Sequence, residues 1–185
     1  MTKMDTRFQI FTLSKEESNC PLVPQLIELG IELYQLFGKT KGTEITMSMP
    51  YGKRVLINTS DTVINHLSRS DFIEIVDYDP VRNILLFIGQ KQPHEMTPIH
   101  WIIHNAKPEI ASLVFIREKT NSIQFPKTIS QTVQEEGTVF EMAKIVLKIL
   151  QNKPVIHIQE RGVLITGNSI AKVKETIHQY MGRNQ

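Results

Sequence analysis

The chain has 185 residues, of which 41% are hydrophobic and 22% charged, and such values are typical of a soluble globular domain. Its 21 Lys and Arg against 19 Asp and Glu give a net charge of +2, which provides no electrostatic reason to expect a nucleic-acid or membrane partner. A single cysteine, Cys20, excludes an intramolecular disulfide and any multi-cysteine metal site. We expect a cytoplasmic protein, in which only the six histidines leave a route to a metal site.

Hydrophobic periodicity and turn residues predict the secondary structure in chain order. Residues 1–20 are expected to form an N-terminal tail or an edge strand, and residues 21–185 a single domain. Residues 119–135 are polar and are expected to form a loop. The remaining elements are expected to be a helix over 24–37, strands over 43–49, 54–58, 70–77 and 83–88, a helix over 97–105, a strand over 111–116, a helix over 139–150, strands over 155–158 and 162–167, and a helix over 169–180. This order predicts an α/β fold in which helices cover a mainly antiparallel sheet.

Short motifs mark the ends of several of these elements. They are Thr43-Glu-Ile-Thr46, Leu56-Ile-Asn-Thr-Ser-Asp61, Glu95-Met-Thr-Pro-Ile-His100 with a later Lys107-Pro-Glu109, Gly137-Thr138, and Arg161-Gly162. In this order they resemble the motifs of the class II aldolase and adducin head-domain family, and the resemblance spans about residues 22–180. The segment 95–100 is its most specific part.

The resemblance implies both a fold and a chemistry. The fold is a three-layer α/β/α arrangement with a central, mainly antiparallel sheet. In enzymes of the family, three histidines hold zinc, which polarises a carbonyl group so that an enediolate can form. A glutamate moves the proton. Family members act on sugar phosphates and assemble as rings of subunits, often tetramers, so the resemblance also implies a homo-oligomer.

Most residues that carry this chemistry are replaced at the matching positions of this sequence. The two histidines of a His-x-His strand match Phe115 and Arg117, and the third matches Arg161. Neither a phenyl ring nor a guanidinium group can coordinate zinc. The acid–base glutamate matches Met96, with Glu95 one residue early. The resemblance therefore implies a chain without the catalytic residues of the family and without zinc.

The positions that match the family's phosphate loops are also altered. Glu44 and Asp61 place negative charge where a phosphate would lie, and this is repulsive. Two arginines nevertheless offer guanidinium groups that suit a small carboxylate or phosphate. The alternative is that they pair with local acids. The candidate ligand-binding residues are Thr43, Glu44, Ser60, Arg117 and Arg161.

Three histidines lie close together in the sequence, away from the family's ligand positions. His100 and His104 are four residues apart, on one face of the expected helix, and His94 lies in the loop before it. A relocated metal site would use these three imidazoles. The alternative is that they pack in the core.

Two hypotheses follow. The first is a catalytically impaired class II aldolase-like domain, a pseudoenzyme that acts as a binding or structural protein for a small anion or another partner. The alternative is an enzyme of the same family, a sugar-phosphate aldolase or epimerase of the aldehyde-lyase type with a rearranged metal site.

Overall fold

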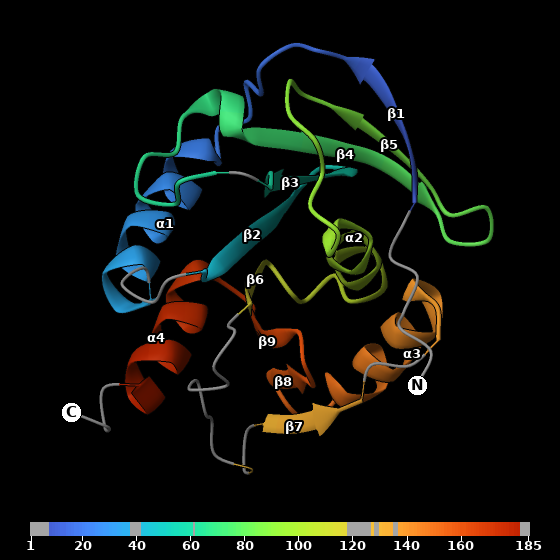
Figure 1. Cartoon of the computed structure of the whole chain (residues 1–185). Coiled ribbons are helices and arrows are strands. Elements are labelled where there is room, and N and C mark those ends of the chain that lie inside the picture. Colours follow the sequence, from blue (N-terminus) through green and yellow to red (C-terminus); the bar gives the residue numbers. More distant parts are fainter. Residues whose placement is uncertain are drawn as a thin grey trace.

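The computed structural model describes residues 8–37, 42–60, 62–117, 127, 130–134 and 137–181 (Figure 1). Along these residues the elements are β1 (Gln9–Ser14), α1 (Val23–Phe37), β2 (Glu44–Tyr51), β3 (Arg54–Asn58), a 3-10 turn (Arg69–Asp71), β4 (Phe72–Asp79), β5 (Ile84–Ile88), α2 (Thr97–Ala106), β6 (Ser112–Arg117), β7 (Ser130–Val133), α3 (Val139–Ile149), β8 (Val155–Ile158), β9 (Gly162–Gly167) and α4 (Ile170–Met181). None of the described helices is long and apolar enough to cross a membrane.

The nine strands of the described residues join one mixed sheet, in the order β1-β5-β4-β3-β2-β6-β9-β8-β7. Six of its eight strand pairs are antiparallel, and the two parallel pairs, β1 with β5 and β7 with β8, lie at the two edges. The centre of the sheet is β2, paired with β3 on one side and β6 on the other. The first half of β2 pairs with β6 and its second half with β3, so β2 joins strands from both halves of the chain.

Helices pack on both faces of this sheet, α1 and α4 on one and α2 and α3 on the other (Figure 1). The alternation of side chains along β6 explains how one strand contacts the helices on both faces. Val114 and Ile116 belong to the buried cluster of α1 and α4, whereas Leu113 and Phe115 belong to that of α2 and α3. A third cluster, which includes Ile57 and Phe87 together with Ile102 of α2 and Ala143 of α3, extends the core on the α2 and α3 face. Apolar clusters thus hold the sheet from both faces.

The starts of α2 and α3 agree with the sequence prediction. Pro98 lies in the first turn of α2. At the start of α3, the predicted capping box is present: Glu141 N donates to Thr138 Oγ1 at 3.3 Å, and Thr138 N donates to Glu141 Oε2 at 2.7 Å.

The sheet edges differ from the sequence prediction. The expected loop over 119–135 contains a strand, β7, within its described part. Its sequence Ser-Gln-Thr-Val has one apolar residue, Val133, and the strand forms because β8 provides a parallel partner. At the other edge, β1 pairs with β5 and is an edge strand rather than a tail. It belongs to the same sheet as the domain expected over 21–185.

Candidate functional site

Backbone pairing brings together the positions that the family motifs mark. Glu44, at the start of β2, lies opposite Arg117, at the end of β6. On the other side of β6, Ile116 lies opposite Val163, directly after the turn that carries Arg161. Gly162 permits this close approach, because a Cβ at that position would lie 2.1 Å from the carbonyl oxygen of Ile116. The three strands therefore converge at one end of the sheet.

Two acids and two arginines form an ion-pair cluster at this point. Arg161 Nη1 donates to Glu95 Oε1 at 2.9 Å, and Arg117 Nη2 contacts the same carboxylate oxygen. Arg117 Nη1 also donates to Glu44 Oε2 at 3.2 Å. The side chain of Arg161 is 11% exposed and that of Arg117 27%, whereas those of Glu95 and Glu44 are 31% and 53% exposed, so only the Arg161 side of the cluster is well shielded from water. Its formal charges cancel.

Glu95 and Met96 face different surroundings, although they are neighbours in the sequence. Met96 is fully buried in the same apolar cluster as Phe115. Glu95 instead meets the two arginines. The arginines thus converge as a pair, and their common partner is an acid of the chain itself.

A second polar group lies beneath the cluster, between β2 and α2. His100 is fully buried and His104 is 5% exposed. Ser48 Oγ lies 2.7 Å from His100 Nδ1 and 2.8 Å from His104 Nε2. Thr46 Oγ1 lies 3.1 Å from His100 Nε2, and His104 Nδ1 lies 3.0 Å from the carbonyl oxygen of Ile110. All four ring nitrogens are thus within hydrogen-bond reach of a protein oxygen.

The direction of these hydrogen bonds follows from the carbonyl at one end. Burial lowers the pKa of His100 well below its ordinary value and that of His104 to about 4, so both rings are neutral at pH 7. The Ile110 carbonyl can only accept, so His104 carries its proton on Nδ1 and accepts on Nε2 from the Ser48 hydroxyl. Ser48 then accepts from His100 Nδ1, and His100 Nε2 accepts from the Thr46 hydroxyl. The proton of Thr46 is therefore committed to His100.

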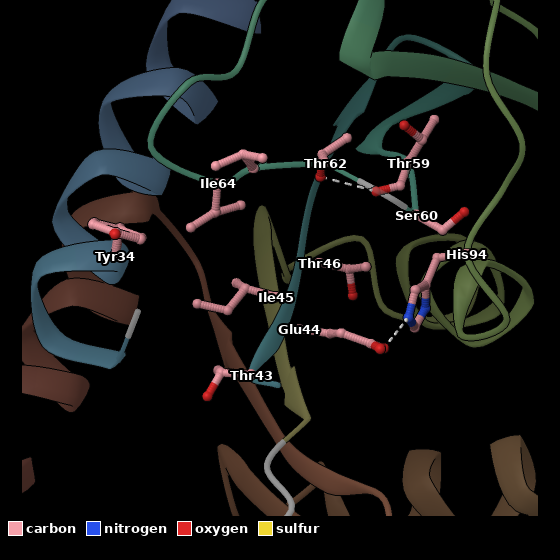
Figure 2. A pocket seen from close by; sticks show the side chains of 11 residues that line it. Tyr34, Thr43, Glu44, Ile45, Thr46, Thr59, Ser60, Thr62, Ile64 and His94 are labelled. Atoms are coloured by element: carbon pink, nitrogen blue, oxygen red, sulfur yellow. Dashed lines mark hydrogen bonds and ion pairs between the residues drawn. The ribbon is translucent and has the colours of Figure 1, made fainter. Parts of the chain in front are cut away.

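A pocket of about 340 Å³ opens beside this network (Figure 2). It is lined by residues 43–46 at the start of β2, by residues 59–60 and 62–64 after β3, by Tyr34 of α1 and by His94. Figure 2 shows the Glu44 carboxylate and the His94 ring pointing toward each other, and their nearest atoms lie 3.5 Å apart. His94 Nδ1 accepts from the backbone N–H of Met96 at 3.1 Å, which leaves the Nε2 proton directed at Glu44.

No family model and no curated protein matches this sequence. Solved structures do match its fold. A structure of YgbL from Klebsiella pneumoniae superposes with a TM-score of 0.63 at 12% identity, over 85% of this chain and 84% of that one. L-fuculose-1-phosphate aldolase from Thermus thermophilus gives 0.61 at 14% identity, over 86% of each chain. The N-terminal class II aldolase domain of a Thermoplasma acidophilum protein gives 0.61 at 11% identity, over 97% of each chain. The chain has the class II aldolase fold.

Zinc does not fit the donors that this class II aldolase fold presents at the marked positions. Arg117 and Arg161 hold permanent positive charges and have no lone pair to donate. Among the residues that the structure describes, no group of three or more His, Cys, Asp or Glu side chains is placed to hold a metal ion. His94 is turned to Glu44, while His100 and His104 are bonded to Ser48. In the described structure these three histidines thus bond to protein groups and are not grouped as a set of metal ligands.

The structure divides the candidate ligand-binding residues into two places. Thr43, Glu44 and Ser60 line the pocket, whereas Arg117 and Arg161 belong to the ion-pair cluster. Glu44 takes part in both. Asp61, at the loop position that matches a family glycine, lies outside the described residues.

Sequence reasoning missed the role of two polar residues in β2. Thr46 and Ser48 alternate with Ile45, Met47 and Met49 in an otherwise apolar strand. Polar residues two apart on a strand share a face, and that face meets His100 and His104, which are four apart on α2. The combination of these two spacings was the available indication of a buried polar network.

Proposed function

We propose that this chain is a class II aldolase-fold domain that has lost zinc-dependent aldol chemistry and acts as a binding or structural protein. One observation carries the proposal: the Glu95 carboxylate contacts both Arg117 and Arg161, the two arginines that stand at matched zinc-ligand positions. A cation bound between two guanidinium groups would be repelled rather than held. Without a Lewis acid, an enediolate has nothing to stabilise its charge.

The position that matches the acid–base residue supports the same proposal. The side chain of Met96 is fully buried beside Phe115 and has no ionisable group. Glu95 is the nearest acid, but its carboxylate is held by the two arginines. A proton-transfer residue has to reach substrate, and here the carboxylate faces protein cations instead.

Restoring the three histidines tests the proposal. The variant Phe115→His, Arg117→His, Arg161→His places two imidazoles two residues apart on β6 and a third on the turn before its neighbour β9. We therefore expect it to bind about one zinc ion per chain by mass spectrometry of metals. The parent chain should bind less than a tenth as much and should cleave no sugar phosphate. Arg54→His, Arg82→His, Phe140→His is the matched control, since its positions are scattered, and it should behave as the parent does.

Stoichiometric zinc in the parent, together with cleavage or epimerisation of a sugar phosphate, would overturn the proposal in favour of the family enzyme with a rearranged site. The small anion expected from the two arginines would have to displace Glu95, which they already bind. Anion binding is thus a competition that calorimetry with inorganic phosphate and with dicarboxylates can measure.

The proposal includes a cytoplasmic homo-oligomer, such as a tetramer, with no resident cofactor. Exposed apolar side chains support an assembly: Phe11 and Leu13 of β1 are 53% and 55% exposed, and Ile145 of α3 is 41% exposed. Light scattering should give a mass that is a multiple of the chain mass. A monomer at micromolar concentration would remove this part of the proposal.

A further inference from the structure

Three of the threonine hydroxyls that line the pocket, those of Thr46, Thr59 and Thr62, have their protons committed to the protein. Thr46 donates to His100 Nε2, as the hydrogen-bond direction requires. Thr59 Oγ1 donates to the carbonyl oxygen of Asp71 at 3.2 Å, and Thr62 Oγ1 donates to that of Thr59 at 3.1 Å. Since these protons are used within the protein, the three hydroxyls can act toward a ligand only as acceptors. Thr46 and Thr59 are each 1% exposed, and Thr62 Oγ1 also accepts from Asn58 Nδ2 at 3.4 Å.

The charged groups of the pocket also favour a ligand that donates hydrogen bonds. Glu44 adds acceptor oxygens, and none of the lining residues in the described chain is Lys or Arg. The imidazole proton of His94 is directed at Glu44. The hydroxyl of Thr43 is buried and has no partner in the described residues, which makes it the one lining threonine whose proton is unassigned. A phosphate or carboxylate needs several donors and would find mainly acceptors here.

A cation does not match the pocket better than a phosphate or carboxylate does. The Glu44 carboxylate already bonds to Arg117, and the neighbouring Glu95 is shared by Arg117 and Arg161. The local formal charge therefore sums to zero. Acceptor oxygens in a neutral site are matched by uncharged hydroxyl donors, because these donate without bringing a charge that has to be desolvated.

The opposite side of the pocket is mostly apolar, with the phenol hydroxyl of Tyr34 as its polar group. Tyr34, Ile45 and Ile64 point toward the same space from α1, β2 and the loop after β3 (Figure 2). A ring and two aliphatic side chains provide a surface for C–H groups. A ligand with hydroxyls along one edge and carbon along the other would contact both sides.

We propose that the pocket binds a neutral polyhydroxylated small molecule, a sugar or polyol without a phosphate group, whose hydroxyls donate to Thr46 and Glu44. This ligand assignment rests on the binding role proposed above. It reverses the preference that the family motifs imply, because the threonine protons point into the protein and Glu44 stands where a phosphate loop would be neutral.

Calorimetry on the full chain tests the assignment with neutral and charged probes, among which ribose and ribose 5-phosphate are a matched pair. The neutral probes are xylitol, ribose and erythritol, and the charged ones are ribose 5-phosphate, inorganic phosphate and ethanolamine. We expect at least one neutral probe to bind at least tenfold more tightly than every charged one. Thr46→Val should weaken that binding about tenfold, and Thr46→Ser should restore it. Thr132→Val, which alters an exposed threonine in β7 at the far edge of the sheet, should change nothing.

Glu44→Gln provides a variant independent of the buried network, because Glu44 is exposed. It should weaken polyol binding and reduce the discrimination against ribose 5-phosphate. The assignment is overturned if a phosphate binds more tightly than every polyol, if no polyol binds, or if both Thr46→Val and Glu44→Gln bind as the parent does. Phosphate binding without turnover would leave the binding role intact, whereas stoichiometric zinc with turnover would overturn the role itself.

Discussion

Ser48 links two buried histidines, and removing its hydroxyl should destabilise the chain strongly. In Ser48→Ala, the Nδ1 proton of His100 and the Nε2 lone pair of His104 lose partners at 2.7 and 2.8 Å, in a place with no access to water. A buried polar group without a partner costs about 1–3 kcal/mol. Allowing for relaxation of the rings, we expect the free energy of unfolding to fall by about 3 kcal/mol, which corresponds to roughly 6–12 °C in Tm for a domain of this size.

Urea titration at pH 7.5 measures this loss, and Ser112→Ala is its matched control. Ser112 is also fully buried, on the adjacent strand β6, but its hydroxyl has no partner in the described part of the chain. Ser112→Ala should therefore stay within about 1 kcal/mol of the parent or exceed it in stability. Equal losses in the two variants would refute the hydrogen-bond network as the source of the effect.

Two further predictions concern buried positions next to β2 and β6. Burial keeps the pKa of His100 well below its ordinary value and that of His104 at about 4, so the unfolded chain binds more protons than the folded chain below pH 6.5. The free energy of unfolding should therefore fall by about 4 kcal/mol between pH 7.5 and 5, and by about half of that in His104→Gln; a flat profile in the parent would contradict it. Gly162 has a φ of +146° and no room for a Cβ beside Ile116, so Gly162→Ala should cost about 3 kcal/mol or more in urea titrations. Gly52→Ala, with a φ of +59° and open space, should cost only about 1 kcal/mol, and similar losses in the two would argue against the close approach.

Sequence reasoning predicted the elements whose hydrophobic pattern is strong and failed at the edges of the sheet. The capping box of Thr138 predicted the start of α3, because a cap is a local interaction. Strand β7 was missed, since its Ser-Gln-Thr-Val sequence becomes a strand only through pairing with β8. Strand β1 was left open between a tail and an edge strand. Its side chains at Gln9 to Leu13 are exposed on both faces, so the strand carries no alternation of buried and exposed positions.

At the site, the sequence predicted less about side-chain partners than about the backbone elements that carry them. The motif positions left open whether Arg117 and Arg161 converge, and it is the pairing of β6 with β9 that brings residue 117 beside the turn with residue 161. The motif positions also did not determine which partner each guanidinium takes, since this depends on side-chain rotamers and on charges from distant segments. The sequence left anion binding and local pairing open, and the structure has both arginines on Glu95.

Under the proposed loss of the zinc histidines, the place of Glu95 follows from the two guanidinium groups at the matched positions. Gly162 holds β9 against β6 so closely that residues 117 and 161 are neighbours whatever their side chains. Two arginines at such positions repel each other unless a carboxylate lies between them. Met96 cannot provide one, because it packs with Phe115 in the core, whereas the preceding residue faces the other way. An acid one position earlier than the family's glutamate is therefore the counter-ion that the arginine pair requires, and the same backbone that suits a metal site accommodates an ion-pair cluster without a change of fold.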